Sequence, residues 1–355
     1  MDIQNLLKLT IENKASDLHL LVGIPPSIRI DGILNSLTNF PVISEEELEK
    51  MIFSLLKPDQ REILLANKEL DFSFGIDKDM NSNEGRFRSN VYYQKGFLAG
   101  AFRYLDPKIR TIEQLGLPKI CDDFANLKQG FILVTGPTGH GKSTTLAAII
   151  NQINLNKSAH ILTIEDPIEY IYPQGKSIVS QREMGQDSHS WAHALRSSLR
   201  EDPDVVMVGE MRDPETISSA ITIAETGHLV FSTLHTNSAS QTVDRMIDSF
   251  PANQQPQIRA QLASTLKGII SQRLLPQING GRVPAVEVLL GNNAVASNIR
   301  DGKTHLLDSI IETSQNIGMI SLEQSLSSLV MNGTISLETA KSYALHPEDL
   351  LRLTQ

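Results

Sequence analysis

The amino-acid sequence predicts an α/β protein of two domains, a small α+β domain followed by a larger domain built on a mainly parallel sheet. Its 355 residues are enough for two folding units of ordinary size. An apolar run at residues 131–135 leads through a glycine-rich stretch into a helical pattern. Beyond that point strands and helices alternate, which is typical of a parallel sheet covered by helices on both faces.

Composition and charge exclude several classes of protein. The net charge of −9 argues against a general nucleic-acid binder, so we expect no nucleic-acid partner. Cys121 is the only cysteine, which excludes an intramolecular disulfide, argues against a cysteine-based metal site and suits the cytosol. No apolar run approaches the ~20 residues of a membrane-spanning helix, and the N-terminus lacks the basic region of a signal peptide. Any membrane association is therefore expected to be peripheral.

The first domain is expected to span residues 1–105. Ser44 and Glu47 have the spacing of a capping box ahead of a helical apolar stripe, and Lys95-Gly96 is typical of a hairpin turn. The expected elements are a helix at 5–13, strands at 18–22 and 27–32 (the latter closed by a turn), a helix at 48–56, and strands at 71–76, 86–94 and 97–105. Residues 106–120 hold two prolines and a Leu-Gly-Leu stretch, so we place a linker at 106–117.

The second domain is expected to span residues 118–355. Its predicted elements are a strand at 131–135, a helix from 144, a strand at 161–164, a helix at 190–200, a strand at 205–208, a helix at 216–225 and a strand at 229–234. From residue 238 the pattern predicts mostly helix, including one long helix at 257–275 and shorter ones at 294–300, 321–331 and 336–344.

The glycine-rich stretch fits the pattern of a phosphate-binding loop. Its residues are Gly136, Pro137, Thr138, Gly139, His140, Gly141, Lys142, Ser143 and Thr144. Glycines let the backbone curl so that several N–H groups point at one phosphate, and the following helix N-terminus attracts negative charge. Lys142 can reach the β- and γ-phosphates, and the Ser143 hydroxyl can bind Mg²⁺. A chance match in a glycine-rich turn is the alternative, and the flanking strand and helix argue against it. We therefore expect ATP and Mg²⁺ as ligands.

Acidic and histidine side chains follow the predicted strands. Glu165, Glu210 and His235 each come after a strand, and carboxyl ends of parallel strands meet at one edge of a sheet. Hydrolysis of a nucleoside triphosphate needs a carboxylate for Mg²⁺ and a group that orients water, which Glu210 and the acidic stretch ending at Glu169 could supply. A solvated acidic turn is the alternative for that stretch. His228 and His235 flank one strand and face opposite ways, which favours His235 for the site.

Four motifs together resemble the secretion-ATPase superfamily, and within it they are most similar to the type IV pilus retraction ATPases. The motifs lie at residues 136–145, 163–170, 196–213 and 224–236, and the similarity extends to residues 15–20 near the start of the chain. The resemblance implies a homohexameric ring whose subunits have an N-terminal PAS-like domain and a C-terminal RecA-like P-loop ATPase domain.

The resemblance also implies roles for single residues. Lys142 and Ser143 resemble the Walker A pair and Glu210 the Walker B acid that serves Mg²⁺. Glu169 resembles the catalytic glutamate, with Glu165 beside it. His228 and His235 resemble the family's paired histidines. Arg88 and Arg103 resemble arginines of the N-terminal domain that reach nucleotide across an interface, and no acidic partner for them is evident in the sequence nearby.

The function that this resemblance implies is a cytoplasmic motor that hydrolyses ATP to power retraction of type IV pili. Its partner would be the inner-membrane platform protein of the pilus machine. The alternatives are an accessory retraction ATPase, a secretion-system ATPase of the same superfamily, and a catalytically silent ring subunit that serves as a scaffold. A DNA translocase conflicts with the acidic balance.

Two stretches depart from the family pattern. His140 stands in the loop where the family usually has Ser, and its side chain is expected to point away from the phosphates. Retraction ATPases carry the motif Ala-Ile-Arg-Asn-Leu-Ile-Arg-Glu near the C-terminus. Here residues 294–301 read Ala-Val-Ala-Ser-Asn-Ile-Arg-Asp. The departure bears on the choice between retraction and its alternatives and leaves ATP hydrolysis untouched.

Overall fold

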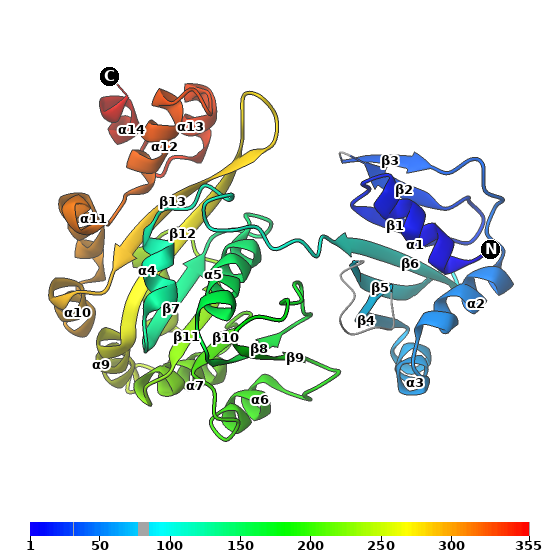
Figure 1. Ribbon diagram of the computed structural model, residues 1–355, viewed down its shortest axis with the longest axis horizontal. Coiled ribbons are helices and arrows are strands. Elements are labelled where there is room, and N and C mark those ends of the chain that lie inside the picture. Colours follow the sequence, from blue (N-terminus) through cyan, green and yellow to red (C-terminus); the bar gives the residue numbers. More distant parts are fainter. Residues whose placement is uncertain (31, 77–84, 355) are drawn as a thin grey trace. The chain divides into compact units, whose positions relative to one another are not determined.

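A computed structural model describes residues 1–30, 32–76 and 85–354 of the chain. The chain divides into two compact units (Figure 1). Unit 1 comprises Met1–Lys108 together with the short segment Pro167–Pro173, and unit 2 comprises Ile109–Asp166 and Gln174–Gln355. Each unit has its own sheet and its own hydrophobic core.

Unit 1 is an antiparallel sheet with helices packed on it. Its elements are α1 (Ile3–Glu12), β1 (Asp17–Leu21), β2 (Ser27–Ile30), β3 (Ile33–Ser36), α2 (Glu45–Leu55), α3 (Pro58–Asn67), β4 (Glu69–Gly75), β5 (Arg86–Gln94) and β6 (Phe97–Leu105). Among the described residues the strand order is β3-β2-β1-β6-β5-β4. Phe87 and Phe102 are fully buried and lie near Phe74, so aromatic side chains fill the centre of this core. The predicted α+β domain is confirmed.

Local signals in unit 1 give the expected structure. Ser44 and Glu47 form both hydrogen bonds of the capping box at the start of α2. Lys95 and Gly96 have φ values of 50° and 87°, so they make the two-residue hairpin turn between β5 and β6. The turn expected after β2 includes Asp31, which lies outside the described residues. The sequence did not predict β3 or α3.

Unit 2 is a mainly parallel sheet. Its elements up to the last parallel βα unit are α4 (Ile120–Asn126), β7 (Gly130–Thr135), α5 (Lys142–Asn156), β8 (His160–Glu165), β9 (Ile178–Glu183), α6 (Trp191–Ser198), β10 (Val205–Val208), α7 (Pro214–Glu225) and β11 (Leu229–Leu234). The rest are α8 (Ala239–Asp248), α9 (Gln255–Thr265), β12 (Leu266–Pro276), β13 (Arg282–Leu290), α10 (Asn293–Arg300), η1 (Thr304–Leu306), α11 (Leu307–Thr313), η2 (Gln315–Ile317), α12 (Leu322–Met331), α13 (Leu337–Tyr343) and α14 (Pro347–Leu353). Among the described residues the strand order is β13-β12-β7-β11-β10-β8-β9, with only β13 antiparallel.

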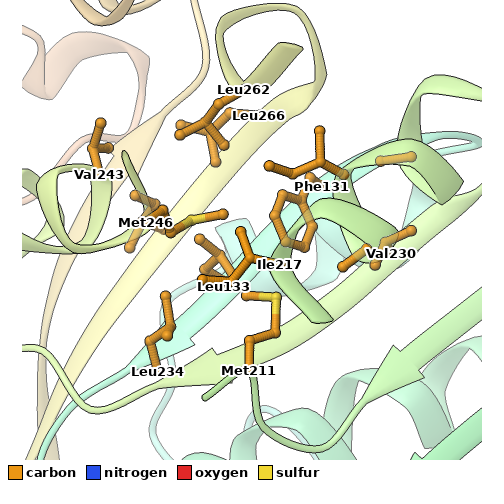
Figure 2. Packing of buried hydrophobic residues seen from close by; sticks show 14 of the residues in the cluster. Phe131, Leu133, Met211, Ile217, Val230, Leu234, Val243, Met246, Leu262 and Leu266 are labelled. Atoms are coloured by element: carbon orange, nitrogen blue, oxygen red, sulfur yellow. The ribbon is translucent and has the colours of Figure 1, made fainter. Parts of the chain in front are cut away.

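Both faces of this sheet are covered, as the alternation of strands and helices predicted. Every residue of β7, β10 and β11 is buried. Phe131 and Leu133 pack with residues of α7, α8 and α9 on one face (Figure 2), and the alternate residues Ile132 and Val134 face α5 on the other. A strand buried on both sides is apolar throughout, which is why the sequence shows an unbroken apolar run here.

The helix predicted at residues 257–275 is wrong beyond Thr265, although the segment from residue 238 onward is mostly helical as expected. Helix α9 ends at Thr265, and the next residue begins the long strand β12. Strand β12 pairs in parallel with β7 and in antiparallel with β13, so it lies inside the sheet. Ile269 and Ile270 are both fully buried. A short apolar run buried on all sides has no periodicity that separates strand from helix, which is why the sequence misled.

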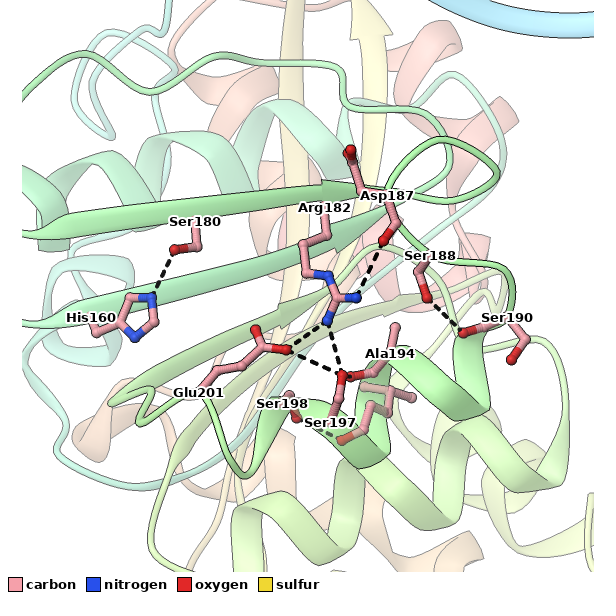
Figure 3. A network of polar contacts seen from close by, with 11 residues as sticks. His160, Ser180, Arg182, Asp187, Ser188, Ser190, Ala194, Ser197, Ser198 and Glu201 are labelled. Atoms are coloured by element: carbon pink, nitrogen blue, oxygen red, sulfur yellow. Dashed lines mark hydrogen bonds and ion pairs between the residues drawn. The ribbon is translucent and has the colours of Figure 1, made fainter. Parts of the chain in front are cut away.

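Edge strand β9 was also missed, and polar contacts hold it in place. Arg182 on β9 donates from Nη1 to Glu201 Oε1 at 2.7 Å and to Ser197 Oγ at 3.0 Å (Figure 3). Its Nη2 donates to the carbonyl oxygen of Asp187 at 3.3 Å. These bonds join β9 to helix α6 and the turn that follows it. A strand anchored by side-chain polar contacts lacks the apolar alternation by which strands are predicted.

Candidate functional site

The glycine-rich loop joins the central strand β7 to helix α5. Gly136, Gly139 and Gly141 have φ values of 142°, 80° and 82°, in the region that favours glycine. A Cβ atom on Gly136 would lie 2.2 Å from the carbonyl oxygen of Gln272 on β12. The loop therefore leaves the sheet where neighbouring backbone leaves no room for a side chain.

Lys142 is the first residue of α5, and its side chain turns back into the loop. Its Nζ atom donates to the carbonyl oxygens of Gly136 at 2.8 Å and Pro137 at 3.0 Å. The side chain is buried, whereas Ser143 and Thr144 in the same turn are partly exposed. Gly141 caps the helix without a side-chain hydrogen bond, so the N-terminus of α5, the positive end of the helix dipole, lies at the loop. The ammonium group and this helix end give the loop positive potential.

His235 and Glu210 lie beside the loop and contact each other. His235 Nε2 is 3.1 Å from Glu210 Oε1, and His235 Nδ1 is 3.4 Å from Lys142 Nζ and 3.3 Å from Thr138 Oγ1. An ammonium group can only donate, so Nδ1 accepts and Nε2 carries the proton that Glu210 accepts. These contacts join three adjacent strands, because the loop follows β7, His235 follows β11 and Glu210 follows β10.

Glu210 is an ionised carboxylate in this setting. Arg212 Nη2 donates to Glu210 Oε2 at 2.9 Å. Burial by itself raises the pKa of Glu210, but the hydrogen bond from Arg212 and the contact with His235 outweigh it, so this pKa lies below its ordinary value. A negative charge is therefore maintained beside Lys142 at neutral pH.

Glu165 lies farther along the same edge of the sheet. It ends β8, which is separated from β7 by β10 and β11. Its Oε1 atom accepts hydrogen bonds from Thr163 Oγ1 at 2.7 Å and from Gln181 Nε2 at 3.4 Å. These two contacts tie Glu165 to β8 and β9.

His228 lies at the opposite edge of the sheet from His235. It precedes β11, at the amino end of the parallel strands, and its carbonyl accepts from Gly130 N at the start of β7. Its Nδ1 is 3.0 Å from Thr226 Oγ1 and 3.0 Å from the carbonyl oxygen of Ile223. Six residues of strand separate the two histidines, about 20 Å of extended chain, so the structure does not bring His228 to the loop.

Arg88, Arg103 and Glu169 belong to unit 1, as the division of the chain into units assigns them. Arg88 on β5 and Arg103 on β6 are directly opposite each other in the sheet, and both are exposed. Arg103 has an acidic partner that the neighbouring sequence does not show, because its Nε atom is 2.9 Å from Asp17 Oδ1 on β1. The partner is 86 positions away in the chain, so the sequence near Arg103 gives no sign of it.

The side chain of His140 faces strand β12. Its Nδ1 atom accepts a hydrogen bond from Leu274 N at 3.0 Å, and its ring centre is 6.3 Å from that of Tyr343 on α13. Burial lowers the pKa of His140, and the nearby charges of Arg273, Lys142 and Arg282 lower it further. The ring is therefore neutral, as its acceptor role requires.

Sequence reasoning missed two residues that contact the site. Arg212 follows Glu210 by two positions, and a cation so close to a predicted metal-site acid was a signal that could have been used. Gln272 contacts the loop from β12 and gave no signal, because its segment read as helix.

No helix in the described part of the chain is long and apolar enough to cross a membrane. Residues 1–30, 32–76 and 85–354 contain no group of three or more His, Cys, Asp or Glu side chains arranged to hold a metal ion.

The chain is similar over nearly its whole length to proteins that have been named or solved. The chain is 44% identical to the type IV pilus retraction ATPase PilT of Pseudomonas aeruginosa, over 98% of this chain and 100% of that protein. It is 47% identical to a twitching motility protein of Neisseria gonorrhoeae, over 92% of this chain and 86% of that protein. A crystal structure of the pilus retraction motor PilT with bound ADP is similar with a TM-score of 0.92 and 48% identity, covering 99% of each chain.

The family assignment rests on a match over most of the chain. The model of the family described as type II/IV secretion system protein matches residues 103–333, which include every element from β7 to α12. The predicted fold class, an N-terminal α+β domain followed by a P-loop ATPase domain with C-terminal helices, is confirmed by the topology and by the solved relative. This chain belongs to the type II/IV secretion system protein family.

Proposed function

We propose that this chain is an ATP-hydrolysing motor that drives retraction of type IV pili. The observation that carries the proposal is the set of contacts joining Lys142, His235 and Glu210 at the glycine-rich loop. It stands in a chain that resembles pilus retraction ATPases along nearly its whole length. The solved relative binds ADP, which supports a nucleotide at the same loop here.

The residues at the loop fit a magnesium nucleotide. The curl at Gly136, Gly139 and Gly141 and the N-terminus of α5 suit an anionic phosphate group. Ser143 and Glu210 supply oxygen ligands of the kind that Mg²⁺ prefers. When bound with ATP, Mg²⁺ would neutralise charge on the β- and γ-phosphates, of which only the γ-phosphoryl group is transferred to water while ADP leaves. Phosphate oxygens would complete the coordination that the protein side chains alone do not supply.

Each protein group has a role that its setting suits. Lys142 binds the phosphates through a buried ammonium group. His235 orients Glu210 and links it to the loop, since His235 contacts both Glu210 and Thr138. We assign Glu169 the activation of water and Arg88 and Arg103 the binding of phosphate charge. Glu165 supports this edge of the sheet, and His228 has no phosphate contact in the proposal because it lies at the other edge.

The proposal extends to assembly and location. We infer a homohexamer in which domain 1–105, linker 106–117 and ATPase domain 118–355 act together, with the arginines of one subunit completing the site of another. The motor would work at the cytoplasmic face of the inner membrane against the platform protein of the pilus machine. A scaffold without turnover would not need Lys142, Glu169 and Glu210 together.

Replacing Lys142 by Ala is expected to abolish ATP turnover without unfolding the chain. The ammonium group bonds loop carbonyls and belongs to no apolar core, so its loss removes phosphate binding and little packing. Phosphate release and thermal melting of the purified variant check this. Near-natural turnover by a folded Lys142→Ala variant would reject the phosphate-loop assignment.

The variants Glu210→Gln and Glu169→Gln are each expected to lower turnover by about 10²-fold or more while nucleotide still binds, as when a metal ligand or catalytic base is lost. Gln keeps the size of Glu and removes its charge. Measurements of ADP affinity and of turnover on the same samples separate binding from chemistry. If both variants lose ADP binding together with turnover, the proposed catalytic roles are wrong.

The variants Arg88→Gln and Arg103→Gln are each expected to lower turnover at least tenfold in the full chain, since arginine contacts to transferred phosphate are worth far more. Asp17→Asn is the matched control, because it breaks the ion pair with Arg103 and leaves both guanidinium groups in place. If the Asp17→Asn control keeps nearly natural turnover, the lower turnover of the arginine variants is due to lost contact with phosphate. An equal loss in Asp17→Asn would show that Arg103 acts only by stabilising unit 1.

Motility of a pilus-bearing strain that lacks its own retraction ATPase tests the cellular function. Ala296 of α10 packs partly against the core, and Ser297 beside it is exposed, so this helix face differs from the family pattern while the fold is kept. We expect weak motility from the natural chain and better motility from the variant Ala296→Arg, Ser297→Asn, Asn298→Leu, with equal ATPase rates. Full rescue by the natural chain would show the departure to be neutral, and no rescue by either would favour an accessory or secretion motor.

A further inference from the structure

The side chain of Gln272 joins the phosphate loop, at His140, to helix α5, at Thr145. Its Nε2 atom donates to the carbonyl oxygen of His140 at 2.8 Å, and its Oε1 atom accepts from Thr145 Oγ1 at 2.7 Å. The side chain is 3% exposed, so water does not compete for these bonds. His140 comes before Lys142 and Thr145 follows it, so the amide spans the part of the loop that holds the lysine.

Strand β12 contacts the loop at further points. The backbone oxygen of Gln272 faces Gly136 so closely that no side chain fits there, and Leu274 N donates to the ring of His140. Strand β12 is paired with β7, from which the loop emerges. The loop is thus held by β12 as well as by β7, the strand from which it emerges.

An amide is the side chain that this position requires. Its partners are a carbonyl, which only accepts, and a hydroxyl, which is the donor in the bond described. A carboxylate could accept from Thr145 but could not donate to His140, and an apolar side chain could do neither. Removing the amide would leave the partly buried carbonyl of His140 and the buried hydroxyl of Thr145 without these partners.

We propose that Gln272 is a positioning residue for nucleotide, which holds the phosphate loop in the conformation that receives the phosphates. This inference rests on the proposed nucleotide-binding function of the loop. The side-chain hydrogen bonds of Gln272 go to the loop and to the first turn of α5, so Gln272 acts through the backbone N–H groups and Lys142. Its contribution is the same before and during the reaction, so its loss weakens binding and leaves the chemical step nearly unchanged.

The test uses the full chain and the variant Gln272→Met, which keeps an unbranched side chain of similar size and removes both hydrogen bonds. ADP affinity with Mg²⁺ present and KM for ATP are each expected to worsen about tenfold, the effect of one or two buried hydrogen bonds, with kcat within about twofold of natural. The control Gln277→Met lies at the tip of the same hairpin, where its amide donates to the Arg282 carbonyl. It should leave affinity, KM and kcat unchanged.

Thr145→Val provides a second measurement, because it removes the hydroxyl that Gln272 binds and keeps the side chain's shape. If the two residues act through one bond, the double variant binds ADP more tightly than the product of the two single losses predicts. ADP affinity equal to natural in Gln272→Met, or a loss confined to kcat, overturns the positioning role. A natural chain that binds ADP without hydrolysing ATP would reject the motor function while leaving the affinity comparison decisive for Gln272.

Discussion

The close approach of two backbones at Gly136 is the constraint on which the site depends. The carbonyl oxygen of Gln272 occupies the space that a side chain at Gly136 would need. The chain must therefore leave the central strand through glycine, in a conformation with φ of 142°. This exit sets the curl of the loop, the start of α5 and the return of Lys142 to the loop carbonyls.

The buried sheet brings side chains from neighbouring strands to this loop. Strands β7, β11 and β10 are adjacent and parallel, so the groups that follow them meet at one edge. Lys142, His235, Glu210 and Arg212 form a continuous series of contacts, in which His235 joins the ammonium group of Lys142 to the carboxylate of Glu210 and Arg212 pairs with that carboxylate. Because each charge has an opposite or polar neighbour, the carboxylate of Glu210 stays ionised despite partial burial.

Unit 1 has an electrostatic arrangement of its own. Arg88 and Arg103 face each other across two strands, and like charges in that position repel. Asp17 relieves part of this repulsion through Arg103, and Ser16 hydrogen bonds to the same carboxylate. Burial raises the pKa of Asp17, but the bonds from Ser16 and Arg103 hold it below its ordinary value. Asp17 thus helps to hold two exposed guanidinium groups side by side on one sheet.

The sequence by itself determined the α/β class, the loop with Lys142 and Ser143, and the strand ends that carry Glu210 and His235. These follow from patterns within about ten residues, such as an apolar run, a glycine curl or a capping box. Only the tertiary structure decided that β12 is a strand and that Arg103 pairs with Asp17. Gln272 and His140 are 132 positions apart, and their bond exists only because β12 pairs beside β7. Pairing between distant strands depends on the burial of both faces of the sheet, which no local window of sequence contains.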